Sequence, residues 1–191
     1  MIKSTLKLIA TITFLVTIGV LFYYYIYPKI QDKTKTGNSD KEYVIVSKVV
    51  DGDTFKLSNG EKVRLLGIDT PEYYESDKLD RDAETSGLDK KTIRKLGKLA
   101  SDYVRNFAEG KKVYLVKEPY YDDRDKYGRL LRWVYLEDGT FINGKIISDG
   151  YAQVFEKFPV SKIDELRKLQ REARENNRGL WGEVEGLKQL K

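Results

Sequence analysis

Four carboxylates gather in the sequence around one predicted β-hairpin. Asp51 and Asp53 interrupt one run of strand-forming residues, and Asp69 and Glu72 follow the next run. The pair Asn59-Gly60 between the two runs is a strong hairpin signal, because a tight turn there needs positive φ. Folding the chain at this turn brings the acidic residues of both runs to the same end of the sheet.

Carboxylates held this close repel one another unless a positive charge lies among them. A hard divalent cation with oxygen ligands meets that need, and Arg64 on the returning strand can add a two-pronged donor for a phosphate. The alternative is a polar turn in which Asp and Gly serve only the loop geometry. The hairpin therefore predicts either a metal site or an ordinary acidic turn.

The chain contains neither histidine nor cysteine. This excludes disulfides, Cys/His zinc sites, and every catalytic dyad or triad that uses His or Cys. Chemistry must come from carboxylates, Arg, Lys, Tyr, hydroxyl groups or a bound metal.

The net charge of +5 is unevenly distributed along the 191 residues. Lys3, Lys7 and Lys29 precede residue 32 and no acidic residue does, so residues 32–191 carry 32 basic and 30 acidic side chains. A protein held to nucleic acid by bulk charge would be more basic than this. Any binding of polyanions must therefore depend on a local site.

Residues 8–26 form an uncharged, mostly apolar run of about 19 residues, close to the roughly 20 that span a bilayer as a helix. The run ends in a cluster of tyrosines, which suits a membrane–water interface. A cleaved signal peptide is the alternative, but its apolar region is usually about 7–15 residues and ends in small residues. We therefore expect residues 1–27 to be an uncleaved anchor.

Residues 28–41 are polar and rich in turn formers, which predicts a tether. With its N-terminus inside the cell, the anchored chain would be a single-pass protein of the cell membrane with an extracytoplasmic domain. A cleaved chain would be secreted. Lysines on both sides of the segment leave its orientation undecided by the positive-inside rule. We expect the protein to be monomeric.

Residues 42–182 are expected to form one soluble domain, followed by a C-terminal tail at 183–191. Strands are predicted at 41–50, 54–57, 62–67, 111–117 and 130–136, and a helix with one apolar face at 92–108. Five short strands with a helix after the third fit an α+β, mainly β fold. The expected form is a five-stranded OB-type barrel with about three helices. A mixed open sheet is the alternative.

Three further segments lie between or after these elements. Residues 73–91 are charged and weakly periodic, which predicts a solvated loop with at most one helical turn, and a mobile flap over the acidic site is the alternative. Asn143 is expected to cap a short helix that ends at Gly150. Ser161 and Asp164 predict a capping box for a last helix.

The spacing of the acidic motifs is more informative than any one carboxylate pair. D-G-D-T at 51–54, an arginine eleven residues beyond the second Asp, and D-T-P-E at 69–72 together resemble the staphylococcal nuclease (thermonuclease) family. That family also has a D-x-Y-G-R element, here at 125–129, and an R-G-L-W tail, here at 178–181. The resemblance covers residues 42–182.

The resemblance implies a calcium-dependent endonuclease that hydrolyses phosphodiester bonds of DNA, RNA or both. In the roles that it implies, Asp53 and Asp69 supply carboxylate oxygens to Ca²⁺ and Thr70 supplies its carbonyl. Glu72 activates or orients the attacking water.

The basic residues complete the implied site. Arg64 and Arg129 hold the phosphodiester and the extra charge of its transition state, while Lys126 and Tyr127 contact a neighbouring phosphate. These assignments agree with what in-line attack needs: a proton acceptor for water, a cation, and fixed donors where charge develops. A catalytically silent OB module that binds nucleic acid at the membrane is the alternative.

Overall fold

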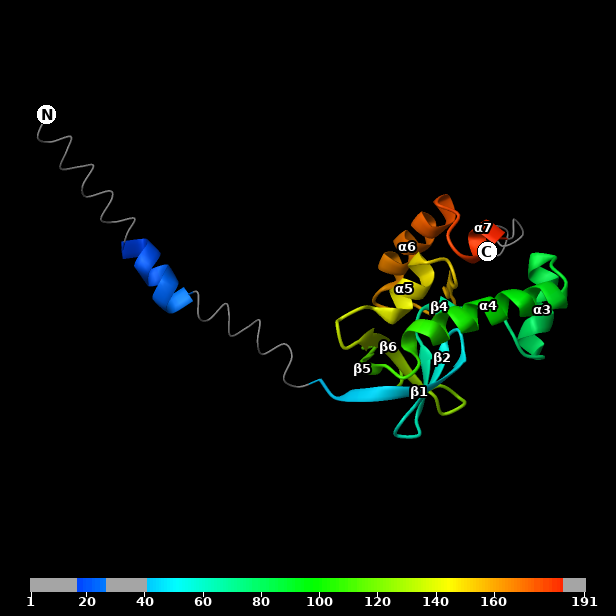
Figure 1. Cartoon of the computed structure of the whole chain (residues 1–191), viewed down its shortest axis with the longest axis horizontal. Helices are drawn as coiled ribbons and strands as arrows, with labels where there is room; N and C mark the ends of the chain where they lie inside the picture. The colour runs from blue at the N-terminus through cyan, green and yellow to red at the C-terminus, as the bar shows by residue number, and fades with distance from the viewer. Residues whose placement is uncertain (1–16, 27–40, 184–191) are drawn as a thin grey trace, which may run out of the picture. The chain divides into compact units, whose positions relative to one another are not determined.

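The computed structural model describes residues 17–26 and 41–183. The chain divides into two units, residues 1–41 and 42–191 (Figure 1). In the first, residues 17–21 are helical and lead into the π-helical turn η1 (Phe22–Ile26). No helix in the described part of the chain has the length and apolarity needed to cross a membrane. Most of the predicted anchor and tether, and the tail after residue 183, lie outside the described residues.

The second unit contains a closed five-stranded barrel in the order β1-β2-β3-β6-β5. Its strands are β1 (Tyr43–Asp51), β2 (Thr54–Leu57), β3 (Lys62–Leu65), β5 (Lys112–Lys117) and β6 (Leu130–Leu136). Neighbouring strands are antiparallel except β3 and β6, which run parallel. The closed barrel confirms the predicted five-stranded, OB-like architecture and excludes the open sheet. The description as mainly β with about three helices is wrong, because the helices between residues 77 and 183 of the described chain together contain more residues than the strands.

The β2–β3 hairpin shows how the sequence pattern builds the barrel. Phe55 pairs with Val63, and both are fully buried, as are alternate residues along each strand. Thr54 pairs with Arg64 on the opposite face. The turn differs from the two-residue form expected, because Leu57 pairs with Glu61 and, of the turn residues, only Gly60 has positive φ. This is a three-residue loop with glycine in the left-handed position.

A second, two-stranded sheet joins β4 (Ile68–Asp69) to β7 (Gln153–Val154), and the sequence pattern did not indicate it. The predicted third strand ends at Leu65, because Gly67 has a φ of +69° and turns the chain into β4. A Cβ atom at residue 67 would lie 2.5 Å from the Leu166 side chain. The turn therefore needs glycine, and it places Asp69 at the end of β4.

The prediction of a loop over residues 73–91 is wrong. Helix α3 (Asp77–Ser86) occupies most of it, with Ser76 accepting from the backbone N–H of Leu79 at its start and Gly87 in the left-handed conformation at its end. Leu79 is fully buried and holds the helix against the domain. One deeply buried apolar residue in ten produces little periodicity, which explains why the sequence pattern did not reveal the helix.

The long predicted helix is confirmed as α4 (Lys90–Ala108), which begins two residues earlier than expected because Asp89 caps it. Three helices follow: α5 (Ile142–Ser148), α6 (Ile163–Glu175) and α7 (Leu180–Glu183). In α7, Leu180 and Trp181 of the R-G-L-W segment are buried with Leu96 and Ala100 of α4 in a cluster separate from the barrel core.

Both predicted caps in this region are wrong. Asn143 lies inside α5 and is fully buried, where Oδ1 accepts from the Val134 N–H and Nδ2 donates to the Leu66 carbonyl. Its side chain therefore links α5 to the barrel wall instead of capping the start of the helix. Ser161 makes no cap to α6 because its hydroxyl donates to the buried carboxylate of Glu118.

Candidate active site

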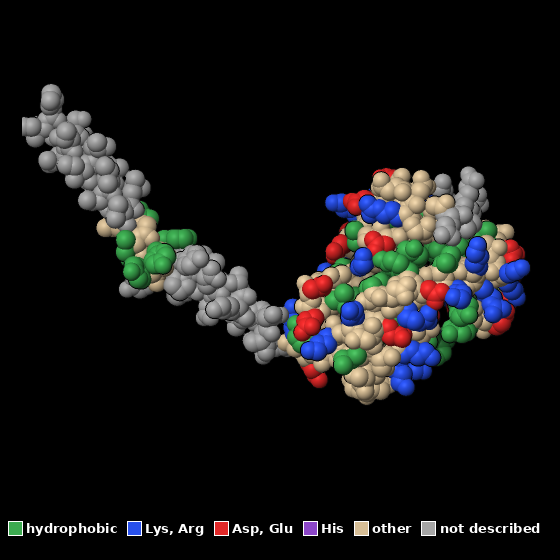
Figure 2. Space-filling view, viewed as in Figure 1, with side chains coloured by type: hydrophobic (Ala, Val, Ile, Leu, Met, Phe, Trp, Pro, Cys, Tyr) green, Lys and Arg blue, Asp and Glu red, His purple; other side chains and the backbone are tan. Residues whose placement is uncertain are grey.

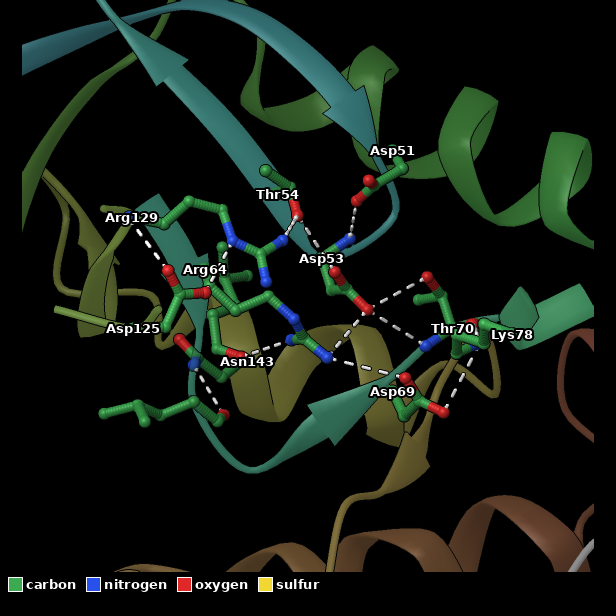
Figure 3. A network of polar contacts seen from close by, with 12 residues as sticks. Asp51, Asp53, Thr54, Arg64, Asp69, Thr70, Lys78, Asp125, Arg129 and Asn143 are labelled. Carbon is green, nitrogen blue, oxygen red and sulfur yellow. Dashed lines mark hydrogen bonds and ion pairs between the residues drawn. The ribbon is translucent and has the colours of Figure 1, made fainter. Parts of the chain in front are cut away.

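Asp51 and Asp53 lie at the turn that joins β1 to β2. Asp51 pairs with Thr54 across the turn, so Gly52 and Asp53 form its two-residue loop. The Asp53 backbone N–H donates to Asp51 Oδ1 at 3.0 Å, which is a common way for aspartate to stabilise a turn. Asp53 is buried, and its carboxylate faces Arg64 and Thr70 (Figure 3).

Arg64 lies between the two carboxylates that were predicted to bind metal. Its Nη2 is 3.1 Å from Asp53 Oδ2 and 3.4 Å from Asp69 Oδ1 (Figure 3). The arginine comes from β3 and the two acids come from the β1–β2 turn and from β4. The structure thus brings Asp53 and Asp69 together around one guanidinium group, as the hairpin register predicted.

Thr70 is fixed to this cluster by its backbone and by its side chain. Its N–H and its hydroxyl both donate to Asp53 Oδ2 at 3.3 Å. A Cβ atom on Gly52 would lie 2.6 Å from Thr70 Cγ2, so the D-G-D turn packs against Thr70 only with glycine in its centre. The carbonyl of Thr70, the third predicted metal ligand, accepts a hydrogen bond from Lys78 Nζ at 2.9 Å.

Burial and like charge raise the pKa of two carboxylates in the cluster. Burial raises the pKa of Asp51 to about 7, and the adjacent Asp53 carboxylate adds to the rise. Burial raises the pKa of Asp69 to about 6, where Asp53 adds to the rise and the charges of Lys78 and Arg64 oppose it. The cluster therefore favours an additional positive charge, either a proton or a metal ion. Asp51 is among the four clustered carboxylates of the sequence but receives no role from the family resemblance, although the D-G-D motif contains it.

Arg129 joins the cluster through a threonine. Its Nε donates to Asp125 Oδ2 at 2.8 Å and its Nη1 donates to the Thr54 hydroxyl at 3.2 Å. Thr54 in turn donates to Asp53 Oδ1 at 3.1 Å. Parallel pairing of β6 with β3 places this arginine near Arg64, and Asp125 orients its guanidinium. The sequence pattern did not identify Asp125 or Thr54 as part of the site.

Lys126 and Tyr127 lie in the turn just before Arg129. The Tyr127 side chain is exposed, with Lys126 Nζ 4.9 Å from its ring centroid and Arg129 Cζ 5.5 Å from it. Gly128 has a φ of +78° and turns the chain back, so that Arg129 lies directly before the first residue of β6. This solvent-facing arrangement is compatible with the phosphate contact predicted for Lys126 and Tyr127, which stays a prediction.

Glu72 is not joined to this network. Its carboxylate accepts from the backbone N–H groups of Tyr73 and Tyr74 at 3.2 and 3.5 Å. Its backbone, however, is held tightly, because a Cβ atom on Gly97 of α4 would lie 2.6 Å from the Glu72 carbonyl carbon and the Pro71 oxygen. Helix α4 thus approaches the D-T-P-E segment as closely as a glycine permits. This contact fixes the position of the Glu72 backbone.

Helix α3 contributes two charged residues that the sequence pattern did not assign to the site. Lys78 Nζ lies 3.6 Å from Asp69 Oδ2 and donates to Asp82 Oδ2 at 2.9 Å (Figure 3). A cavity of about 40 Å³ adjoins them, lined in part by Asp69, Thr70, Lys78 and Asp82. Because residues 73–91 were predicted to be a loop, neither Lys78 nor Asp82 was expected near the site.

The proposed metal ligands are all hard oxygen donors. Two carboxylates and a main-chain carbonyl are the oxygen ligands that Ca²⁺ takes, with water completing the shell. Within residues 17–26 and 41–183, however, no group of three or more acidic side chains is arranged to hold a metal ion. Asp53, Asp69 and Thr70 therefore suit such an ion by type, while Arg64 and Lys78 supply the positive charge beside them.

The surface of the second unit carries both signs of charge. On the face shown in Figure 2, Lys and Arg side chains are interspersed with Asp and Glu side chains over the second unit. This agrees with the near balance of charge in residues 32–191 and leaves local arginines as the means of binding a phosphate.

Comparison with known proteins gives a consistent picture. A family model described as staphylococcal nuclease homologue matches residues 62–183, a stretch that includes Arg64 and Arg129 and begins after Asp53. A protein named thermonuclease, from Staphylococcus intermedius, is 30% identical over 172 residues, which is 87% of this chain and 92% of that protein.

Two further relatives carry endonuclease names. An uncharacterized endonuclease of Escherichia coli is 32% identical over 143 residues, covering 73% of this chain and 77% of that protein. Endonuclease YhcR of Bacillus subtilis is 29% identical over 170 residues, which is 84% of this chain but 13% of that much longer protein.

Proposed function

Because the chain belongs to the staphylococcal nuclease family, we propose that it is a metal-dependent endonuclease that hydrolyses phosphodiester bonds in DNA, RNA or both. The observation that carries the proposal is the convergence of Asp53, Asp69 and Arg64, with Arg129 linked to them through Thr54. These groups combine hard oxygen ligands with two permanent cations in one place, which is what phosphoryl chemistry requires.

In the proposed mechanism, Asp53, Asp69 and the Thr70 carbonyl hold Ca²⁺. When bound, that ion supplies positive charge to the phosphate oxygens and to the attacking water. With an ion held there, the two carboxylates would not depend on Arg64 for a counter-charge. The Arg64 guanidinium would then be free to donate to the phosphodiester in the bidentate geometry that arginine favours.

Arg129 and Glu72 complete the proposed reaction. Arg129 is held by Asp125 through Nε, so its terminal nitrogens can face the phosphate oxygens that gain charge in the transition state. Glu72 accepts the proton of the attacking water once its carboxylate leaves the Tyr73 and Tyr74 amides. The chain has no histidine, and arginine is a poor acid, so water protonates the leaving oxygen.

The test is digestion of single- and double-stranded DNA and RNA by the full chain, first in chelator and then with Ca²⁺ added. Cleavage should be absent in chelator and should return with Ca²⁺. Full activity in chelator, or rescue by Zn²⁺ alone, would contradict the metal assignment. Nucleic-acid binding without cleavage under any of these conditions would favour the silent OB module instead.

We also propose that residues 8–26 anchor the protein in the cell membrane, with the nuclease domain on the extracytoplasmic side. The apolar run and its tyrosine cluster support this. The full-length chain should then stay with membranes after an alkaline carbonate wash and should retain its original N-terminus. A soluble form beginning near residues 28–40 would indicate a cleaved signal peptide and secretion.

A further inference from the structure

Lys78 makes contact with two of the three proposed metal ligands. Its ammonium group donates to the Thr70 carbonyl at 2.9 Å and lies 3.6 Å from Asp69 Oδ2 (Figure 3). An ammonium group is a compact point charge with three donors, so it can take a cation's place among oxygens. The positive charge of Lys78 thus lies beside oxygens that the proposed Ca²⁺ would need.

The third oxygen that Lys78 contacts belongs to Asp82, one helical turn further along α3. The Nζ to Oδ2 distance is 2.9 Å, and the two residues share a helix face at i and i+4. The Asp82 side chain forms no hydrogen bond or ion pair with Asp53, Asp69 or Thr70, all of which the structure describes. Lys78 can therefore keep its ion pair with Asp82 when the Thr70 and Asp69 oxygens bind another cation.

The surroundings make this contact stronger than a surface ion pair. The side chains of Lys78, Asp69 and Asp82 are only 27–30% exposed, and Leu79, the next residue in α3, is fully buried. Partial burial lowers the screening by water, so the charges interact more strongly than exposed ones do. The buried Leu79 also restricts how far the helix can carry Lys78 away.

From this geometry we propose that Lys78 is a built-in competitor of the catalytic metal. Without metal, it neutralises Asp69 and satisfies the Thr70 carbonyl. When a divalent cation binds, Lys78 gives up these oxygens and keeps Asp82. The inference rests on the proposed metal site and adds to it a residue that sets the affinity of that site for Ca²⁺.

A second ion pair, between α3 and the first residue of α4, supplies a matched control. Lys90 forms an ion pair with Asp80 of α3, and both side chains are about half exposed. Neither residue contacts Asp53, Asp69 or Thr70 in this pairing. Lys90→Met thus removes one lysine and one ion pair of α3 without touching the proposed metal ligands.

The experiment measures Ca²⁺ binding to the full chain by isothermal titration calorimetry, with no nucleic acid present. Lys78→Met should tighten the Kd for Ca²⁺ by about tenfold or more, while Lys90→Met should leave it within about twofold. Asp82→Asn should weaken binding in the wild-type background. In the Lys78→Met background it should have a much smaller effect, because Asp82 acts through Lys78.

Thermal unfolding gives a second readout that a purely structural lysine would not produce. In chelator, Lys78→Met should lower the Tm, because Asp69 and the Thr70 carbonyl lose their partner. In saturating Ca²⁺ the Tm values of variant and wild type should converge. An equal Tm loss under both conditions, or an unchanged or weaker Kd for Ca²⁺, would overturn the inference.

These outcomes also separate this inference from the proposed function. If the wild type binds Ca²⁺ and needs it for cleavage while Lys78→Met leaves the Kd unchanged, only the role of Lys78 is wrong. If neither the wild type nor Lys78→Met binds Ca²⁺ and cleavage persists in chelator, the metal site itself is wrong and both proposals fail.

Discussion

Two sets of partly or fully buried acidic side chains in the same domain are held in opposite ways. At the candidate site, Asp51, Asp53 and Asp69 lie near one another with Arg64 and Lys78 beside them, and the pKa values of Asp51 and Asp69 are raised. Beyond α5, Asp149 stands apart from other acids, and it accepts hydrogen bonds from Lys145 Nζ at 2.7 Å and from the Tyr103 hydroxyl.

The negative charge of Asp149 is balanced by its hydrogen-bond donors. Burial works against its ionisation, but the bonds from Lys145 and Tyr103 outweigh it and lower the pKa of Asp149. Tyr103 is in turn stacked on Tyr151, with ring centroids 3.9 Å apart. Asp149 therefore stabilises the fold by joining α4 to the end of α5.

The difference separates a carboxylate whose charge the fold stabilises from carboxylates whose charge the fold disfavours. A group with a lowered pKa is more stable ionised in the folded state than in the unfolded state, whereas a group with a raised pKa is less so. The ionised form of Asp149 stabilises the fold without any ligand, through Lys145 and Tyr103. Ionisation of Asp51 and Asp69, whose pKa values are raised, is unfavourable in the folded state unless a further positive charge joins them, which is compatible with the proposed metal site.

The largest expected effect separates the two regions by catalysis. Arg129→Ala removes donors from a transition state that carries more charge than the substrate, so kcat should fall by on the order of 10²–10³-fold, with a smaller change in KM. Asp149→Asn should leave kcat close to that of the wild type. Steady-state cleavage assays in saturating Ca²⁺, well below both Tm values, make the comparison. A similar loss of kcat in both variants would remove the distinction.

Glu72→Gln sharpens the comparison within the site. The substitution keeps the shape of the side chain and removes its capacity to take a proton, so the rate should fall by at least about 10²-fold. DNA affinity should stay the same or rise slightly, because a negative charge near the phosphate is lost. Single-turnover cleavage and equilibrium binding, both in saturating Ca²⁺, measure these quantities. Cleavage at the wild-type rate would show that Glu72 is not the base.

Stability should respond with opposite signs at the two places when no metal is present. Asp149→Asn should lower the free energy of unfolding by about 1–3 kcal/mol, since Lys145 and Tyr103 lose a charged acceptor. Asp51→Asn keeps an oxygen for the Asp53 N–H and removes a like charge, so it should raise that free energy by about 1 kcal/mol. Urea unfolding at pH 8 in chelator tests both. Destabilisation by Asp51→Asn would break the comparison.

The smallest effect is a pH dependence in chelator. Between about pH 4 and 7 the folded state holds protons on Asp51 and Asp69 that the unfolded state releases, so their contribution to stability falls as pH rises. The contribution of Asp149 is present above about pH 4 and is lost as pH falls through its lowered pKa. Urea unfolding from pH 3 to 8 should show a shallower decline between pH 5 and 7 in Asp51→Asn than in the wild type. Identical slopes would contradict the raised pKa of Asp51.

The local pattern of the sequence determined much of the barrel and part of the site. Alternation along 54–57 and 62–67 predicted the hairpin, and its register predicted that Asp53 and Asp69 would meet. The apolar face of 92–108 predicted α4. These features follow from side-chain periodicity and turn chemistry, which act between residues close in sequence. The resemblance of the motifs to one nuclease family was confirmed by the family match.

Only the tertiary structure decided what surrounds those carboxylates. Helix α3 is held by its two caps and by one buried leucine, so its sequence has no periodic pattern that predicts a helix. The contact of Lys78 with Thr70 depends on how that helix packs. The side chain of Asn143 reaches the Leu66 carbonyl, and Gly97 admits the Glu72 backbone, because elements far apart in sequence meet there. Burial, the largest cause of the raised pKa values of Asp51 and Asp69, likewise depends on how elements far apart in sequence pack together, as does the Lys78 charge beside Asp69.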